Sequence, residues 1–495
     1  MVQKQKNVVL ILTDQLRKDC IGAYGNPYVR TPNLDQLAAE SIRCECSYVA
    51  NPICCPNRMS LFTGCMPSNH GLWTNGLLGS RPERTLPSYL RSVGYQTANI
   101  GKIHFNPYSR ESEGLSFESE ANWSEIPEKD GYTDGYFGFD YLELTIGHTL
   151  ARSHYYKWFL ENGGTDDMFD VKLYGPVYSP DERCGVRKMP SNLSSTEFVG
   201  ERAVNYLRNV RDENQPFFLS VSFPDPHHPF TSCEDDYLSW KDRELGEPVG
   251  TPDDLKTRPE HYSRHHNGGW TRGGEVPFRY PGGIPKDVAR ERIRHTYAMI
   301  ESIDRNIGKV LDELKRSGLM ENTIIIFASD HGELLGDHGL WLKGPFFYEG
   351  LINTPLLLSV PGLQARKSQQ LVSAVDLFPT LCELLELEIP DYVDGVSQVP
   401  ALKDENVNVR SSCMIEYRNG YNCDKNVNAL VTKEYKFVQY ETGEMEYTDL
   451  VSDPTETVNR AGETGWEEKV LQAAHELLIE KMKNKSKGAI QYGHA

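Results

Sequence analysis

The chain has 495 residues, 39% of them hydrophobic and 25% charged, which excludes a disordered or fibrous protein and predicts one large folded domain with a smaller one. Acidic residues outnumber basic ones by 70 to 52, a formal net charge of −18. This balance argues against nucleic acid or an anionic membrane as the main partner, and an anionic substrate would need a local cluster of cations or a metal ion.

The apolar runs are too short to span a membrane. Residues 8–12 and 324–328 are strand-length runs, far below the roughly 20 residues of a membrane span. The first run begins at Val8, which leaves no room for a secretion signal before it. Eleven cysteines in so long a chain do not indicate a disulfide scaffold. We therefore expect a cytoplasmic protein with no membrane partner, and the sequence leaves its oligomeric state open.

The first 100 residues alternate between strand and helix patterns. Residues 8–13 form an apolar run typical of a buried parallel strand, and Asp14 and Gln15 follow it. Helices are predicted over residues 31–41 and 86–92, and a second strand over 95–100. Alternation of this kind predicts a parallel sheet with helices on both faces.

Two long stretches interrupt this pattern. Residues 105–195 and 231–284 have no clean periodicity, and we interpret both as insertion loops that face the substrate. The second stretch contains His261, His265 and His266. Their spacing resembles a metal site only superficially, so we expect loop residues near the entrance of the site, without an assigned role.

The order resumes between and after these stretches. Helices are predicted over residues 195–210, 288–317 and 376–385, and strands over 216–222, 323–328 and 355–360. After about residue 390 the pattern changes to short strands, at 412–417 and 435–440, and a final helix at 466–483. The predicted fold is therefore α/β, with a large, mostly parallel central sheet flanked by helices in residues 1–390. Residues 391–495 are predicted to form a smaller α+β domain with antiparallel strands.

The first candidate site is the run Cys54-Cys55-Pro56-Asn57-Arg58. Pro56 just inside a helix start places Cys54 at the N-terminus, where backbone N–H groups favour an anion. Arg58, one turn later, could hold an oxyanion beside it. A buried cysteine pair before an ordinary helix explains the same residues, so the motif alone leaves both interpretations open.

The second candidate site combines two strand ends. Asp14 and Gln15 follow one predicted strand, and Asp330 and His331 follow another. Open parallel sheets bind ligands beyond these ends. Two carboxylates, an amide oxygen and an imidazole suit Ca²⁺, Mg²⁺ or Mn²⁺ better than Zn²⁺. Each pair alone could equally cap a turn or a helix.

Four cations or histidines also follow predicted strands: Lys102, His104, His227 and Lys343. A single lysine or histidine is usually a solvated surface group. Four of them at one edge of the sheet would supply the positive field that an anionic substrate needs in this acidic protein.

Five separated blocks of the chain together resemble the type I sulfatases of the alkaline-phosphatase superfamily. In order they are Asp14-Gln15, Cys54-x-Pro56-x-Arg58 with Thr63-Gly64, Gly101-Lys102-x-His104, Pro226-His227-x-Pro229 and Ser329-Asp330-His331-Gly332-Glu333. The segment from Glu446 to Glu456 is similar to the family's closing segment, so the resemblance spans nearly the whole chain. The cysteine signature is its most specific element.

The resemblance implies a modified cysteine and a metal ion. The family's maturation enzyme oxidises the signature cysteine, here Cys54, to formylglycine (3-oxoalanine); Cys55 is out of register with the motif. The resemblance also implies one divalent metal, usually Ca²⁺, held by Asp14, Gln15, Asp330 and His331 together with the modified Cys54. Mn²⁺ and Mg²⁺ remain possible ions. Asn57 stands where Ser or Ala is more usual.

The same resemblance implies hydrolysis of a sulfate monoester. A hydroxyl of the hydrated aldehyde would attack sulfur, with Arg58, Lys102 and Lys343 neutralising charge. His227, with Lys343, would protonate the leaving oxygen, and His104 would deprotonate the second hydroxyl. Asn75 could contact the substrate or serve only as a turn residue before Gly76, and His338 could contact the substrate or support the metal loop. The substrate would be a small sugar, aryl or alkyl sulfate.

Three other functions remain open. A phosphonate monoester or phosphodiester hydrolase would use the same formylglycine site. The chain could also be a non-catalytic anion-binding relative, or an enzyme in which Cys54 stays unmodified. A zinc module is a weaker alternative because its cysteines lack a paired Cys-x₂-Cys framework: Cys44, Cys46, Cys54, Cys55 and Cys65.

Overall fold

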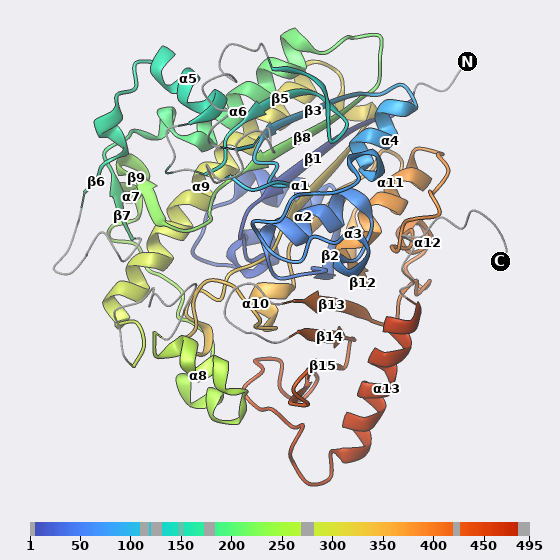
Figure 1. The fold of residues 1–495 in the computed structure, drawn as a ribbon. Coiled ribbons are helices and arrows are strands. Elements are labelled where there is room, and N and C mark those ends of the chain that lie inside the picture. Colours follow the sequence, from blue (N-terminus) through green and yellow to red (C-terminus); the bar gives the residue numbers. More distant parts are fainter. Residues whose placement is uncertain are drawn as a thin grey trace.

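A nine-stranded sheet forms the centre of the protein, in the order β12-β2-β11-β10-β1-β8-β3-β5-β4 (Figure 1). The computed structural model describes residues 5–108, 118–119, 131–147, 149, 152–172, 184–268, 282–418 and 426–483. Parts of both predicted insertions, at 109–117, 120–130, 173–183 and 269–281, lie outside the described residues. No helix in the described part of the chain is long and apolar enough to cross a membrane.

The strands of this sheet are mostly parallel, as predicted. Strand β1 (Asn7–Thr13) pairs in parallel with β10 (Thr323–Ser329) on one side and β8 (Phe217–Phe223) on the other. Strand β3 (Gln96–Gly101) is parallel to β8 and to β5 (Phe139–Leu144). Three pairings are antiparallel: those of β11 (Leu356–Ser359) with β10 and with β2 (Ile42–Tyr48), and that of β4 (Tyr132–Tyr136) with β5. Strand β12 (Arg366–Ser373) runs parallel to β2.

Alternate residues of β1 face two different cores. Val9 and Ile11 pack in a core that helices α1 (Pro32–Ala39), α6 (Ser195–Asn205) and α9 (Lys286–Arg316) complete. Val8 and Leu10 pack on the opposite face, with α2 (Cys54–Thr63), α4 (Leu86–Ser92) and α11 (Leu377–Leu384). Burial on both faces explains why the strand is a continuous apolar run rather than an alternating one.

Both stretches predicted to be insertion loops contain regular structure, and this part of the prediction was wrong. In the first, β4 and β5 extend the central sheet, and helix α5 (Ser153–Glu161) packs against the core. The second contains helices α7 (Glu234–Trp240) and α8 (Glu260–His266). Strands β6 (Val171–Lys172), β7 (Cys184–Arg187) and β9 (Phe230–Cys233) form a small separate sheet. These pairings join distant segments, and local periodicity does not record such contacts.

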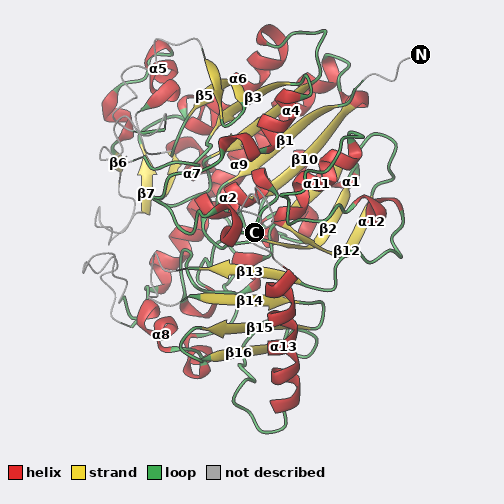
Figure 2. Cartoon of the chain, turned by 45° about the vertical axis from the view of Figure 1, so that its right-hand side comes forward, coloured by secondary structure: helices red, strands yellow, loops and turns green. Residues whose placement is uncertain are grey.

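The C-terminal segment forms a four-stranded antiparallel sheet, shown with its strands side by side in Figure 2. Its strands are β13 (Cys413–Tyr417), β14 (Val427–Val431), β15 (Tyr435–Tyr440) and β16 (Met445–Asp449). Helix α13 (Glu467–Lys483) covers one face, where Ala473 and Leu477 meet Leu430 and Phe437. The other face packs on Leu340 and Phe346 of the main body. The short helices α3 (Pro67–His70), α10 (Glu349–Ile352) and α12 (Val399–Lys403) complete the structure.

Candidate active site

The carboxyl ends of β1 and β10 bring two aspartates together. Thr13 and Ser329 are register partners in the parallel ladder, so the residues that follow them, Asp14 and Asp330, leave the sheet at the same edge. The Asp330 N–H donates to the Thr13 carbonyl at 3.1 Å, and the Gln15 N–H donates to Asp330 Oδ1 at 3.0 Å. Both aspartate side chains are fully buried.

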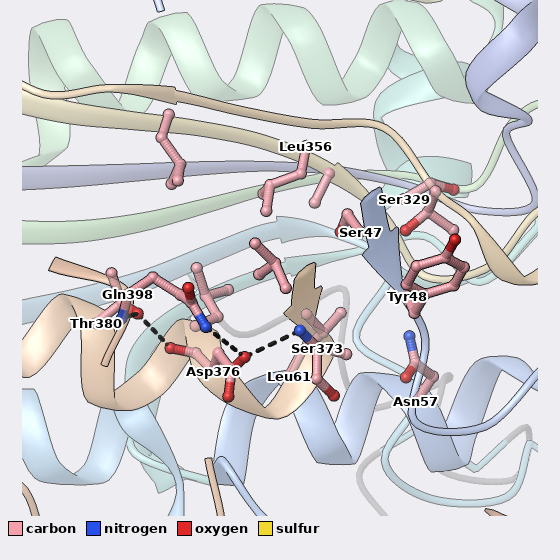
Figure 3. A pocket seen from close by; sticks show the side chains of 16 residues that line it. Ser47, Tyr48, Asn57, Leu61, Ser329, Leu356, Ser373, Asp376, Thr380 and Gln398 are labelled. Atoms are coloured by element: carbon pink, nitrogen blue, oxygen red, sulfur yellow. Dashed lines mark hydrogen bonds between the residues drawn. The ribbon is translucent and has the colours of Figure 1, made fainter. Parts of the chain in front are cut away.

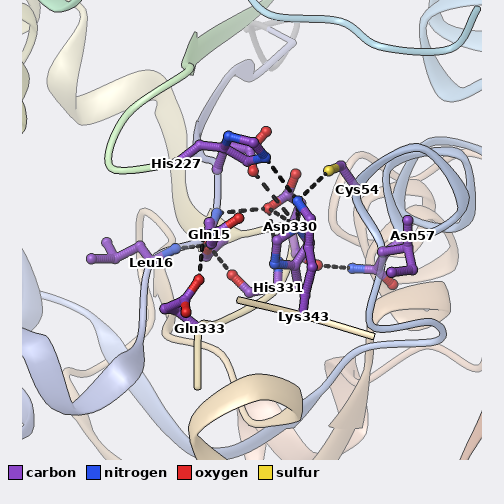
Figure 4. A network of polar contacts seen from close by, with 12 residues as sticks. Gln15, Leu16, Cys54, Asn57, His227, Asp330, His331, Glu333 and Lys343 are labelled. Carbon is purple, nitrogen blue, oxygen red and sulfur yellow. Dashed lines mark hydrogen bonds and ion pairs between the residues drawn. The ribbon is translucent and has the colours of Figure 1, made fainter. Parts of the chain in front are cut away.

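Cys54, the first residue of α2, completes a compact cluster with these strand ends (Figure 4). Ligand atoms of Asp14, Cys54, Asp330 and His331 all lie within 4.8 Å of one another, and all four residues are buried. The neighbouring Cys55 packs instead in the hydrophobic core beneath the helix. The structure therefore selects Cys54 over Cys55 as the cysteine of the site.

Arg58 lies one turn after Cys54 on α2, and its guanidinium faces both aspartates of the cluster. Its Nε donates to Asp330 Oδ2 at 2.7 Å, and its Nη2 lies 3.6 Å from Asp14 Oδ2. Its Nη1 donates to Ser222 Oγ at 2.9 Å. Because the guanidinium has no exposed surface, its charge directly compensates the two buried carboxylates.

Three more of the predicted cationic or imidazole groups converge on the same point. Lys343 Nζ lies 2.7 Å from Cys54 Sγ, 2.9 Å from His227 Nε2 and 3.0 Å from His331 Nε2. Lys102, directly after β3, donates a hydrogen bond to Asp14 Oδ2. Cationic and imidazole groups from the segments that follow β3, β8 and β10 thus meet at one edge of the sheet.

His104 and Asn75 reach Cys54 from two loops. The His104 ring hydrogen-bonds with the Cys54 side chain, and its backbone adopts a left-handed φ of 59°. Asn75 Nδ2 lies 3.8 Å from Cys54 Sγ, while its Oδ1 accepts from the Cys55 N–H at 3.1 Å. Asn75 therefore holds the helix start as well as facing the candidate nucleophile.

The charges of the cluster shift the pKa values of its members. Burial raises the pKa of the Cys54 thiol, but Lys343 and Lys102 outweigh it and hold that pKa well below the usual range. Burial and the Lys343 charge lower the pKa of His227 to about 4, and burial and Lys102 lower that of His104 to about 3. Both imidazoles are therefore neutral at pH 7.

The donor set fits a divalent cation. Asp14 Oδ1 is buried and has no hydrogen-bond partner among the described residues, which is costly for a carboxylate unless an ion satisfies it. Asp330, His331 and the Cys54 side chain lie beside it, so two carboxylates, one imidazole and the group at Cys54 could hold such an ion. The Gln15 amide at the cluster edge donates to Glu333 and lies 3.2 Å from His228 Nδ1.

His338 makes its contacts with residues outside the cluster. Its Nδ1 lies 2.9 Å from Asp254 Oδ2, and its buried ring stacks on Tyr348 at a centroid distance of 4.1 Å. These contacts account for the side chain without a substrate, so its predicted role as a substrate contact gains no support from the geometry.

Residues that the sequence did not single out complete the site. Glu118 accepts backbone N–H groups from His104, Phe105 and Asn106 at 2.7, 3.0 and 3.1 Å, which fixes the loop that carries His104. Asn57, noted only as a departure from the usual motif, donates to the Asp330 carbonyl. No sequence signal identifies Glu118, because its partners are backbone groups.

A mostly apolar cavity lies behind the site, between the sheet and helices α2 and α11 (Figure 3). Asn57, Leu61 and Leu356 line it, and Asp376 at its side bonds to the Ser373 N–H and to Gln398. Cys54 and the cationic groups do not contribute to its walls. The cavity therefore shares Asn57 with the site but lies outside the cluster around Cys54.

Comparison with known proteins relates the chain to one family. The sequence model of the family described as Sulfatase matches residues 6–387, and that of N-sulphoglucosamine sulphohydrolase, C-terminal, matches residues 336–485. An arylsulfatase of Clostridium perfringens is 30% identical over 97% of this chain and 95% of its own. An N-acetylglucosamine-6-O-sulfatase of Bacteroides thetaiotaomicron is 25% identical over 94% and 84%.

The fold has counterparts among solved structures. The phosphonate monoester hydrolase of Agrobacterium radiobacter superimposes with a TM-score of 0.79 and 24% identity, over 97% of this chain and 96% of that one. This likeness concerns the fold: the large mixed sheet with flanking helices and the small antiparallel C-terminal sheet.

Proposed function

We propose that this chain, which belongs to the sulfatase family of hydrolases, cleaves sulfate monoesters with Cys54 converted to formylglycine and one divalent metal ion bound beside it. The observation that carries this proposal is the meeting of Cys54, two aspartates and His331 within 4.8 Å in an enclosed, cation-rich site. Asp14, Asp330 and His331 would hold the ion, and the side-chain amide oxygen of Gln15 would be a further donor. Calcium agrees best with this oxygen-rich set.

The hydrated aldehyde would supply a hydroxyl nucleophile, and the ion would stabilise negative charge on the sulfate oxygens. The protein's own groups prepare the site for that anion. Lys102, directly after β3, and Lys343, on the segment after β10, both face the cluster, and their buried ammonium groups neutralise charge as the ester bond breaks. Arg58 pairs with Asp330 and faces Asp14, so its buried positive charge compensates the two carboxylates.

Proton transfer follows from the shifted histidines. Lys343 and His227 share a hydrogen bond of 2.9 Å, so the proton for the leaving oxygen is held between Nζ and Nε2. His104 is neutral and contacts the Cys54 side chain, which suits it to take a proton from the second hydroxyl. The sulfate would then depart and restore the aldehyde.

The test uses enzyme co-expressed with a formylglycine-generating enzyme. The mass of the tryptic peptide spanning residues 44–58 should show conversion at Cys54, and p-nitrophenyl sulfate should be hydrolysed. Cys54→Ala should abolish turnover, whereas Cys55→Ala, which alters only the apolar core, should retain it. Full activity of the Cys54→Ala variant would overturn the proposal.

Phosphonate monoester hydrolysis at the same site is the alternative that the chemistry leaves open. Comparing kcat/KM for p-nitrophenyl sulfate and for a phenyl phosphonate ester decides between them. We expect the sulfate to be preferred, and a panel of aryl, alkyl and sugar sulfates then identifies the leaving group. Removal of the metal by a chelator should abolish turnover, and added Ca²⁺ should restore it.

A further inference from the structure

Lys343 lies on an unusual piece of backbone, residues 339–345, which we call the lysine strap. Leu342, directly before the lysine, has a left-handed φ of 65° although it is not a glycine. Such a conformation costs on the order of 1 kcal/mol or more and persists only where the surroundings impose it. Part of that constraint comes from the segment just before the strap, because the Leu342 N–H donates to Glu333 and the Leu334 N–H donates to the Leu342 carbonyl.

The rest of the constraint comes from helix α8. Its three histidines each hydrogen-bond a different carbonyl of the strap: His266 Nδ1 to Gly339 at 2.8 Å, His265 Nε2 to Trp341 at 2.8 Å, and His261 Nε2 to Pro345 at 3.1 Å. The bonded carbonyls occur at both ends and in the middle of the strap. A single helix therefore secures the strap on both sides of Lys343.

Two of these histidines are buried, and His266 is half-buried. His261 and His265 are 4% and 5% exposed, and both rings pack against Phe346. Burial lowers the pKa of His265 to about 4. A neutral imidazole has a single N–H donor, and in His265 the bond to the Trp341 carbonyl places that donor on Nε2.

Helix α8 is itself anchored. The Tyr262 hydroxyl donates to Glu446 Oε1 at 2.9 Å, and Arg258, just before the helix, pairs with Glu446 Oε2 at 2.6 Å. Glu446 belongs to strand β16 of the C-terminal sheet. The histidines thus project from a support that the C-terminal sheet holds in place.

We propose that His261, His265 and His266 are positioning residues, which hold the lysine strap so that Lys343 Nζ faces Cys54 and His227. The effect on catalysis rests on the proposed function, whereas the effect of the histidines on the conformation of the strap does not. It also replaces the expectation that the three histidines are loop residues without a role.

The first test removes one donor and then restores it. In matured enzyme, His265→Leu should lower kcat by about 100-fold, the scale expected when a reacting group is misplaced by about 1 Å. His265→Gln, whose amide N–H can reach the same carbonyl, should recover most of that loss. Equal losses in the two variants would overturn the proposal.

A double-mutant cycle separates positioning from general destabilisation. If His265 acts through Lys343, adding His265→Leu to Lys343→Ala should cause little further loss in kcat. His295→Leu is the matched control, since His295 is another buried histidine, whose Nδ1 lies 2.8 Å from Ser232 Oγ. Its effect should be the same in both backgrounds, and additivity for His265→Leu as well would contradict the inference.

Hydrogen exchange gives a readout that needs no activity. In His265→Leu, amide protection should fall in the peptide covering residues 339–345, and in His295→Leu it should not. Unchanged protection of the strap would overturn the inference whatever the substrate proves to be. If the strap loses protection but the matured enzyme hydrolyses no sulfate ester, the proposed function is contradicted and the positioning of the strap by His265 still stands.

Discussion

Arg58 is the residue on which the charge balance of the site depends. It pairs with Asp330 at 2.7 Å and faces Asp14 at 3.6 Å, and none of the three side chains is exposed. Burying two carboxylates this closely is unfavourable unless a cation accompanies them. The arginine of the cysteine motif is therefore a structural requirement of the site as well as part of its signature.

We predict that Arg58→Met lowers the free energy of unfolding by about 3–5 kcal/mol, the usual cost of leaving a buried charge unpaired. Urea denaturation measures the change. Lys256→Met is the control, because Lys256 and Asp253 are 74% and 80% exposed and a pair of this kind contributes at most about 1 kcal/mol. A similar loss in the two variants would show that the Arg58 charge is not needed for folding.

Glu118 links stability to pH. Burial raises its pKa to about 7, although the N–H groups of Phe105 and His104 and the Tyr136 hydroxyl act in the opposite direction. In the unfolded chain a glutamate loses its proton near pH 4.5. Between these two values only the unfolded state releases the proton, so this group makes folding less favourable as the pH rises, and no further change follows above about pH 7.

We predict that replacing Glu118 by Gln flattens this part of the stability profile. Stability measured by denaturation from pH 4.5 to 7.5 should fall more steeply in the wild type, by up to about 3 kcal/mol. The variant should also be less stable at low pH, since one amide –NH₂ would face a backbone donor. An identical slope in both proteins would rule out Glu118 as its source.

At the scale of elements, the site is assembled by strands that end at the same edge. Gly101 closes β3 with a φ of 107°, and a Cβ placed there would lie 1.9 Å from the Ser222 carbonyl oxygen on β8. The absence of a side chain lets β3 and β8 stay paired up to their ends. Lys102 follows immediately and can reach Asp14 for that reason.

We therefore predict that Gly101→Ala separates the ends of β3 and β8 and displaces Lys102, with loss of sulfatase activity and a lower Tm. Gly94→Ala is a matched control: Gly94 has a similar φ of 93°, but a Cβ there would have no atom within 4 Å. It should cost only the backbone penalty of about 1–2 kcal/mol and retain activity. Equal activity in the two variants would contradict the steric argument.

At the scale of the whole molecule, buried ion pairs join the C-terminal sheet to the main body. Arg258 and Glu446 pair at 2.6 Å, each side chain being 3% exposed. Lys436 on β15 binds Glu456, whose carboxylate accepts the Glu349 N–H. These contacts act beside an apolar interface, so they fix the orientation of the sheet in addition to stabilising it.

We predict that Arg258→Met lowers the unfolding free energy by about 3–5 kcal/mol by leaving Glu446 buried without its cation. Thermal unfolding followed by circular dichroism measures the effect. Arg91→Met is the control, since Arg91 and its partner Asp140 are 49% and 35% exposed, and it should change stability by less than about 0.5 kcal/mol. Equal melting temperatures for the Arg258→Met and Arg91→Met variants would contradict the prediction.

Several long elements of the main body could be predicted locally, but strands β2 and β12 of the central sheet were not among them. The apolar run at 8–13 and the helical pattern at 288–317 appear as β1 and α9 with ends shifted by one or two residues, because burial on two faces or on one helical face leaves a periodic signal. Strands β4 and β5 escaped prediction although they are neighbours in the chain, because β5 joins the central sheet through its pairing with the distant β3. Helix α8 also escaped prediction, because three histidines with glycines nearby in the sequence are typical of a loop.

The sequence alone determined which residues could do the chemistry. Short motifs contain a cysteine at a helix start, carboxylates that follow two strands, and cations that follow other strands. Only the tertiary structure decided which of them meet. It placed Lys343 against the thiol of Cys54, the cysteine that the motif register had already indicated, and paired His338 with Asp254 instead of the cluster. The physical reason is that such choices depend on contacts between segments hundreds of residues apart, set by strand register and packing, which local patterns do not encode.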